Sequence, residues 1–284
     1  MSREAWKDFN AIEVHDGGAI VTVRFNRPKM ANAINWEMEA EFNSVLETCD
    51  SDDTVKCVVL CASGRNFSAG HDIAQVAEER VTGAPPATFD GKYWARTGEM
   101  LPAWQFRKAL VVAVKGYVGP HANAILLTAD AVVAAEDSVF SWEENRIGIG
   151  PPYGPYTLLP FHFPLRVLKQ LWMPGGWLDA DTALRLSYVN RVVPLGQEEA
   201  AAQRIAEMYA SMDVGALVAN KKGVHALFEA AGLLPMIDIG REPYEVVGEM
   251  ARQQEEHFRL IHEKGAGVAA RTRDADFDRS LSQV

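Results

Sequence analysis

Residues 56–72 read KCVVLCASGRNFSAGHD, an apolar run followed by small, polar and glycine residues. The run at 56–61 is apolar on both faces, which is typical of a strand buried between two layers. The segment 62–72 then predicts a loop in which glycines let the backbone approach a ligand closely. A plain strand-to-helix turn fits the same pattern, so both interpretations stay open on these residues alone.

Strands and helices alternate outward from this stretch. Alternating or continuous apolar runs predict further strands at 19–25, 110–115, 130–135 and 139–142. Apolar residues at helical spacing predict helices at 34–46, 94–108, 124–129, 198–212, 214–231 and 244–263. The polar segment 78–92, with Gly83, Pro85 and Pro86, predicts a mobile loop. The order indicates an α/β fold with crossover connections, and we place a boundary near residue 196.

Composition excludes several classes of function. The 284 residues are 48% hydrophobic and 23% charged, and they carry a net charge of −10, so nucleic acid and anionic membrane are poor partners. The longest apolar stretch, near 109–114, is too short to span a bilayer, and the polar N-terminus lacks the apolar core of a signal peptide. Three cysteines without a CxxC pair, and no HExxH, indicate a reducing cytoplasm and no metal or cofactor.

Two further segments could carry chemistry. The turn GYVGPH at 116–121 opens a helix, and amides at a helix N-terminus favour a developing anion. The segment FSWEENRIGIGPP at 140–152 places Glu143 and Glu144 between Trp142 and apolar Gly/Pro residues. A carboxylate held against apolar groups has a raised pKa, as a general acid or base requires. A solvated strand end whose acids pair with Arg146 fits this segment equally well.

Taken in order, these segments resemble the crotonase (enoyl-CoA hydratase/isomerase) superfamily over residues 10–230. Asn26-Arg27-Pro28 with Asn32-Ala33 is similar to its NRP…NA signature, and Phe67 to Asp72 to its first oxyanion-hole loop. Further matching residues are Gly116 to Asp130, Phe140, Glu144, Ile147-Gly148, Pro151, Leu178-Asp179-Ala180, Ala183-Leu184 and Val189 to Pro194.

The resemblance implies a crotonase-like spiral of ββα units at 1–196 and a helical C-terminal trimerisation region at 197–284. It implies an acyl-CoA thioester as substrate, a homo-oligomer (a trimer or a dimer of trimers), and an enolate held by the backbone amides of His71 and His121. Glu144, with His121 and Glu143 as further candidates, would be the acid or base. The implied substrate-binding residues are Lys29, Ala31, Ala69, Asp72, Gly119, Trp142 and Pro151; Arg27, Lys29 and Lys221 are candidates for the phosphates.

The sequence also departs from that family pattern. Pro120-His121-Ala122 stands where the family has a glycine run, Ala124 replaces one of the two hydratase glutamates, and Glu143 replaces a proline. A single retained acid suits a 1,3-proton shift better than the addition of water. The favoured interpretation is an enoyl-CoA isomerase or atypical hydratase. The alternatives are a C–C bond hydrolase of the same fold and a degenerate protein that only binds acyl-CoA.

Overall fold

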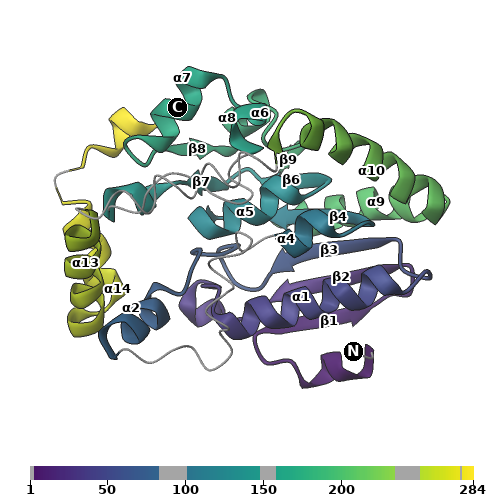
Figure 1. Cartoon of the computed structure of the whole chain (residues 1–284), viewed down its shortest axis with the longest axis horizontal. Coiled ribbons are helices and arrows are strands. Elements are labelled where there is room, and N and C mark those ends of the chain that lie inside the picture. The colour runs from purple at the N-terminus through teal and green to yellow at the C-terminus, as the bar shows by residue number, and fades with distance from the viewer. Residues whose placement is uncertain (1–2, 83–100, 148–157, 234–249, 276) are drawn as a thin grey trace.

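Two β-sheets organise the chain (Figure 1), and the computed structural model describes residues 3–82, 101–147, 158–233, 250–275 and 277–284. The larger sheet has the strand order β1-β2-β3-β4-β6-β9, antiparallel only between β1 and β2. The smaller sheet has the order β5-β7-β8. The strand bounds are β1 Ile12–Asp16, β2 Ile20–Phe25, β3 Cys57–Ala62, β4 Ala109–Val114, β5 Tyr117–Val118, β6 Ala131–Ala135, β7 Val139–Ser141, β8 Trp177–Asp179 and β9 Arg191–Val193.

Strand β3 is buried on both faces, as its apolar sequence predicts. Val58 and Leu60 belong to the main core, which includes α1, α5 and the second sheet. Cys57 and Val59 point to the opposite face, where α9 covers the sheet. Successive side chains of a strand alternate between faces, so a run without polar residues requires cover on both sides.

Helices fill the space around the sheets. Their bounds are α1 Trp36–Ser51, α2 Ile73–Thr82, α4 Leu101–Gln105, α5 Pro120–Thr128, α6 Leu159–His162, α7 Leu165–Trp172, α8 Ala180–Arg185, α9 Glu198–Ala210, α10 Val214–Ala230, α13 Met250–Lys264 and α14 Ala266–Arg273. Short 3₁₀ helices are η1 Arg3–Asp8, η2 Pro28–Met30, η3 Glu143–Ile147 and η5 Arg279–Ser282. In Figure 1, α13 and α14 lie beside α2 at one end of the molecule, and α9 and α10 lie at the other.

Helix α2 corrects one expectation. The sequence predicts a loop from residue 78, whereas 73–82 is helical. Its residue Ala77 is buried in a small cluster with Phe258 and Ile261 of α13. This contact joins segments far apart in the chain, so the local composition of 78–82 gives no sign of it. The rest of the predicted loop, 83–92, lies outside the described residues.

One other helix ends earlier than predicted, and a second is described only in part. Helix α4 ends at Gln105, because the next residues turn into β4 and Lys108 is buried there. The Lys108 ammonium donates to the carbonyl oxygens of Cys49 and Asp52 at the end of α1, which fixes this turn. Helix α13 begins at Met250 in the described part of the chain, and 244–249 lie outside it.

The α/β fold with crossover connections is confirmed, and the boundary near residue 196 stays a prediction. Helix α9 follows that position directly and packs against β4 and β6 of the large sheet. Within the described ranges, no helix combines the length and the apolar character that a membrane crossing needs.

The three cysteines are buried thiols with separate positions in the core. Cys49 lies in α1, and Cys57 and Cys61 lie in β3. Burial raises the pKa of both Cys49 and Cys61 to about 12, so these thiols stay protonated at neutral pH. This environment suits packing and not nucleophilic chemistry.

Candidate active site

The buried side chain of Asn32 holds the loop at 63–72. Its amide nitrogen donates to the carbonyl oxygens of Ser63 at 2.7 Å and Asn66 at 2.9 Å. Its amide oxygen accepts from the backbone nitrogen of Arg27 at 2.9 Å, and its own carbonyl accepts from the Ser68 hydroxyl at 2.7 Å. One amide side chain therefore fastens the segment after β2 to the glycine-rich loop after β3, which explains the Asn32 of the NRP…NA signature.

The same loop sets the direction of the His71 amide. Ile34 donates its backbone N–H to the carbonyl oxygen of Gly70 at 2.8 Å and accepts from the N–H of Asp72 at 2.9 Å. Neighbouring peptide groups of an extended segment point to opposite sides. The N–H of His71, between those two residues, therefore faces away from Ile34.

The loop that precedes α5 is joined to this one by backbone hydrogen bonds. Gly119 donates its backbone N–H to the carbonyl oxygen of Ser68 at 2.8 Å, and Ser68 donates to that of Tyr117 at 3.2 Å. Helix α5 starts immediately afterwards, with Gly119 as N-cap and Pro120 in the first turn. His121 is the second helical residue, so its N–H points out of the helix end, beyond the reach of the intrahelical ladder.

Close packing brings the two predicted amides together. A Cβ placed on Gly70, whose φ is +90°, would lie 3.3 Å from the backbone nitrogen of His121. The imidazole rings of His71 and His121 stack, with 3.7 Å between ring centroids and 15° between planes. The structure thus brings together the two residues that the sequence predicts for an oxyanion hole; their role stays a proposal.

Sequence reasoning missed Asn123, a fully buried polar residue inside the apolar helix α5. Its amide nitrogen donates to the carbonyl oxygens of Gly119 at 3.2 Å and Ser141 at 2.9 Å, and its amide oxygen accepts from the Tyr188 hydroxyl at 2.9 Å. Asn123 therefore ties the start of α5 to the end of β7, where the acidic segment begins. An Asn within the run ANAILL was the available signal, since a buried amide requires several partners.

The acidic segment is a 3₁₀ helix, η3, and not an extended chain. The alternation of an extended segment would point Glu143 and Glu144 to opposite sides; the extended conformation is wrong, and the two side chains still differ in burial. Trp142 is buried against Phe163 and Tyr188. Glu143 is buried as well, whereas Glu144 is half-buried.

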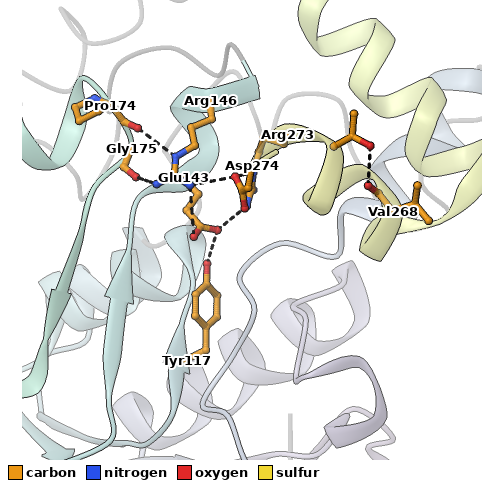
Figure 2. A network of polar contacts seen from close by, with 9 residues as sticks. Tyr117, Glu143, Arg146, Pro174, Gly175, Val268, Arg273 and Asp274 are labelled. Carbon is orange, nitrogen blue, oxygen red and sulfur yellow. Dashed lines mark hydrogen bonds and ion pairs between the residues drawn. The ribbon is translucent and has the colours of Figure 1, made fainter. Parts of the chain in front are cut away.

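Glu143 is held by a network that joins three parts of the chain (Figure 2). Its carboxylate accepts from the Tyr117 hydroxyl and from the Arg273 guanidinium, each at 2.9 Å. Burial, together with the charge of Glu143, raises the pKa of Tyr117 well above its ordinary value, so this phenol stays a donor. This placement makes Glu143 a weaker candidate than Glu144 for proton transfer.

Ala124 lies on the same face of α5 as His121, one turn further along. It is buried, and its methyl group occupies the position that the family resemblance assigns to a second glutamate. Of the two adjacent acids, the half-buried Glu144 is the one that the Tyr117 and Arg273 network does not hold, and its role as acid or base stays a prediction.

The predicted binding residues differ in their exposure and contacts. Lys29 is exposed in η2, and Ala31 accepts a hydrogen bond from Ala69 through its carbonyl. The Asp72 carboxylate lies 2.9 Å from the Arg27 guanidinium and is nearly buried. Pro151 lies outside the described residues.

Lys221 is a poor candidate for a phosphate contact. Its ammonium lies 2.7 Å from the Asp130 carboxylate and donates to the carbonyl of Lys108, and the residue is buried. The described part of the chain holds no group of three or more His, Cys, Asp or Glu side chains arranged to bind a metal ion.

Comparison with known proteins identifies the family of the chain. A family model described as enoyl-CoA hydratase/isomerase matches residues 15–259. The enoyl-CoA hydratase EchA13 of Mycobacterium tuberculosis is 29% identical over 245 residues, which cover 80% of this chain and 76% of that protein. The carnitinyl-CoA dehydratase of Escherichia coli K12 is 30% identical over 206 residues, which cover 72% and 76%.

Solved structures share the fold. An enoyl-CoA hydratase/isomerase from Xanthobacter autotrophicus Py2 superposes with a TM-score of 0.84 at 24% identity, covering 95% of this chain and 99% of that one. An enoyl-CoA hydratase from Mycobacterium smegmatis gives a TM-score of 0.82 at 20% identity, covering 98% and 99%.

Enlarging Gly119 tests whether the contact between the loops is tight. A Cβ there would lie 2.2 Å from the carbonyl oxygen of Ala69, so the Gly119→Ala variant must separate the loops. We expect its free energy of unfolding, measured in urea, to fall by about 1–3 kcal/mol.

The matched control is Gly223→Ala in the middle of α10, where a Cβ meets no atom within 4 Å. Alanine suits a helix better than glycine, so this control should gain up to about 1 kcal/mol. Equal stability of Gly119→Ala and the wild type would show that the loops are not closely packed.

Proposed function

The chain belongs to the enoyl-CoA hydratase/isomerase family, and we propose that it acts on an acyl-CoA thioester by stabilising an enolate. The backbone N–H groups of His71 and His121 would hold the thioester oxygen, and Glu144 would move the proton. The observation that carries this proposal is the contact between the two loops, where Gly70 packs on the backbone nitrogen of His121 and the two imidazoles stack.

The oxyanion hole would be the larger contribution to the rate. Its donors belong to the backbone of two loops that Asn32 and Asn123 hold in place, so they need no reorganisation when charge develops. One such donor is typically worth about 10²–10³ in rate. Removal of a proton beside a thioester becomes feasible when the resulting oxyanion is stabilised in this way.

Glu144 and Ala124 together favour proton transfer over hydration. Addition of water to a double bond uses one group to orient water and another to deliver a proton, and Ala124 supplies neither. A 1,3-proton shift needs one base that takes a proton from one carbon and returns it to another. We therefore propose enoyl-CoA isomerisation, with weak hydration as the second activity.

We place this reaction in the cytoplasm and without a metal or cofactor. The buried, free thiols of Cys49, Cys57 and Cys61 suit a reducing compartment. The proton chemistry of Glu144 and the two amides requires no electron transfer and no Lewis acid.

A panel of CoA thioesters in H₂¹⁸O tests the reaction class by mass spectrometry. Isomerisation leaves the product mass unchanged and moves the double bond, which fragmentation locates. Hydration adds one labelled water, and C–C cleavage adds labelled oxygen to an acid product. Binding of thioesters with no turnover would support the degenerate alternative, and the absence of both binding and turnover would contradict the proposal.

The Glu144→Gln variant tests the acid–base assignment. It keeps the shape of the side chain and removes the base, so turnover should fall about 10²–10⁴-fold with little change in CoA affinity. The exposed Glu136 offers a matched control, since Glu136→Gln removes the same charge from a residue that has no part in the proposed mechanism. Full activity of Glu144→Gln together with loss of activity in His121→Ala would assign the proton transfer to the histidine.

Restoring the second carboxylate gives an independent check. Ala124→Glu places an acid one turn after His121, on the same face of α5. If the missing acid limits hydration, this variant should hydrate a short enoyl-CoA faster than the wild type does. An unchanged rate in a folded variant would mean that water addition is limited elsewhere.

We further propose that the protein is a trimer or a dimer of trimers. Of the 17 residues of α10, only Leu217 and Lys221 are buried, while Val224 and Leu227 remain 52% and 71% exposed. Exposed apolar surface of this kind marks an interface. Multi-angle light scattering should give three or six times the chain mass of 31.3 kDa, and Leu227→Glu should lower it. A monomer at micromolar concentration would contradict the proposal.

A further inference from the structure

We propose that Glu143, Arg146, Arg273 and Asp274 form a latch through which the C-terminal helices position Glu144. The inference rests on the proposed function, because it assigns these four residues a role in orienting the proposed acid–base group. They are positioning residues: they act on the segment that carries Glu144 and not on the substrate.

The latch begins at Glu143, the residue directly before Glu144. Its buried carboxylate accepts from the Arg273 guanidinium and from the Tyr117 hydroxyl (Figure 2). Arg273 ends α14 and Tyr117 lies in β5, so one carboxylate connects three elements. Because the two acids are adjacent, any movement of the Glu143 anchor must also move Glu144.

Arg146 and Asp274 close the network from the other side of η3. The Arg146 guanidinium lies 3.1 Å from the Asp274 carboxylate and 4.0 Å from that of Glu143. Asp274 also accepts two hydrogen bonds from Arg273, each 2.7 Å long. Burial opposes ionisation of Asp274, but the hydrogen bonds and charges of the two arginines outweigh it and hold the pKa of Asp274 below its ordinary value.

The Arg146 side chain also fixes η3 to the turn before β8. It donates to the carbonyl oxygens of Pro174, at 3.2 Å, and Gly175. Its guanidinium lies 3.4 Å from the ring centroid of Phe277, close enough for a cation–π contact. The segment with Glu144 is thus held both by the second sheet and by residues that follow α14.

The same two helices reach the other half of the site. Helix α13 packs Phe258 and Ile261 on Ala77 of α2, and His262 lies 3.0 Å from the Glu78 carboxylate. Helix α2 starts directly after His71 and Asp72. The C-terminal helices therefore contact both α2, which follows the loop with the first amide, and the segment that carries Glu144, so they can set the distance between them.

Burial of its charged side chains distinguishes this latch from ordinary surface ion pairs. The side chains of Glu143, Arg146 and Arg273 are 10%, 5% and 14% exposed, so water screens the network weakly. The family resemblance predicts proline at 143, and proline has no side-chain acceptor for Arg273. The latch therefore depends on Glu143, the residue by which this chain departs from the family pattern.

Four variants test the inference on the thioester that the wild type converts best. Arg273→Gln removes the charge, Arg273→Lys keeps it, Glu143→Gln removes the opposite charge, and Tyr117→Phe removes a single donor. The matched control is Arg271→Gln, an exposed arginine two residues earlier on α14. Melting temperature confirms folding for each, and the milder lysine and phenylalanine variants cover the case in which the others do not fold.

A positioning role predicts a separation of kcat from binding. Arg273→Gln and Glu143→Gln should each lower kcat about 10–100-fold, as a displacement near 1 Å does, while the Kd for the thioester changes less than threefold. Arg273→Lys should recover part of kcat, and the double variant should be no worse than either single one. Arg271→Gln should match the wild type.

Hydrogen exchange tests the latch without any turnover. In Arg273→Gln the backbone amides of 143–147 should exchange about tenfold faster than in the wild type, with no change in Arg271→Gln. Absence of turnover by the wild type would overturn the proposed function and not this structural link. Unchanged exchange, unchanged kcat in a folded Arg273→Gln, or a large loss of thioester affinity with normal kcat would each overturn the latch.

Discussion

The site depends on one steric constraint, the approach of two backbone segments at Gly70 and Gly119. Any side chain at Gly119 would meet the carbonyl of Ala69, and any at Gly70 would press on the first turn of α5. This approach places the amides of His71 and His121 at neighbouring loop ends. The buried amides of Asn32 and Asn123 maintain it from both sides, each with hydrogen bonds to carbonyl oxygens of these loops.

Much of the fold follows from the sequence because its strands are short, apolar and separated by glycine or proline. β2, β3, β4, β6 and β7 all lie within one or two residues of their predicted bounds. The loop at 63–72 was also predictable from its glycines, whereas α5 begins at Pro120, four residues before the predicted helix. Family resemblance, and not residue spacing, predicted the pairing of His71 with His121.

Contacts between distant segments lie beyond local patterns. The C-terminal half of α2 has a loop-like sequence. It packs on α13, almost two hundred residues later in the chain, and a local pattern cannot show that contact. The alternation rule placed Glu143 and Glu144 on opposite sides of a strand, but the chain turns into a 3₁₀ helix there. Lys221 resembled a free cation and instead forms a buried pair with Asp130. No local signal connects Glu143 to Arg273, although that pair joins the acidic segment to the C-terminal helices.

The amides of His71 and His121 are proposed to polarise a thioester carbonyl. Isotope-edited infrared spectroscopy measures this directly on a saturated acyl-CoA carrying ¹³C at the carbonyl. Two N–H donors weaken the C=O bond, so the carbonyl band should shift to lower frequency on binding, and the shift should shrink in Gly119→Ala. A bound thioester whose carbonyl band has the same frequency as in water would contradict the proposed oxyanion hole.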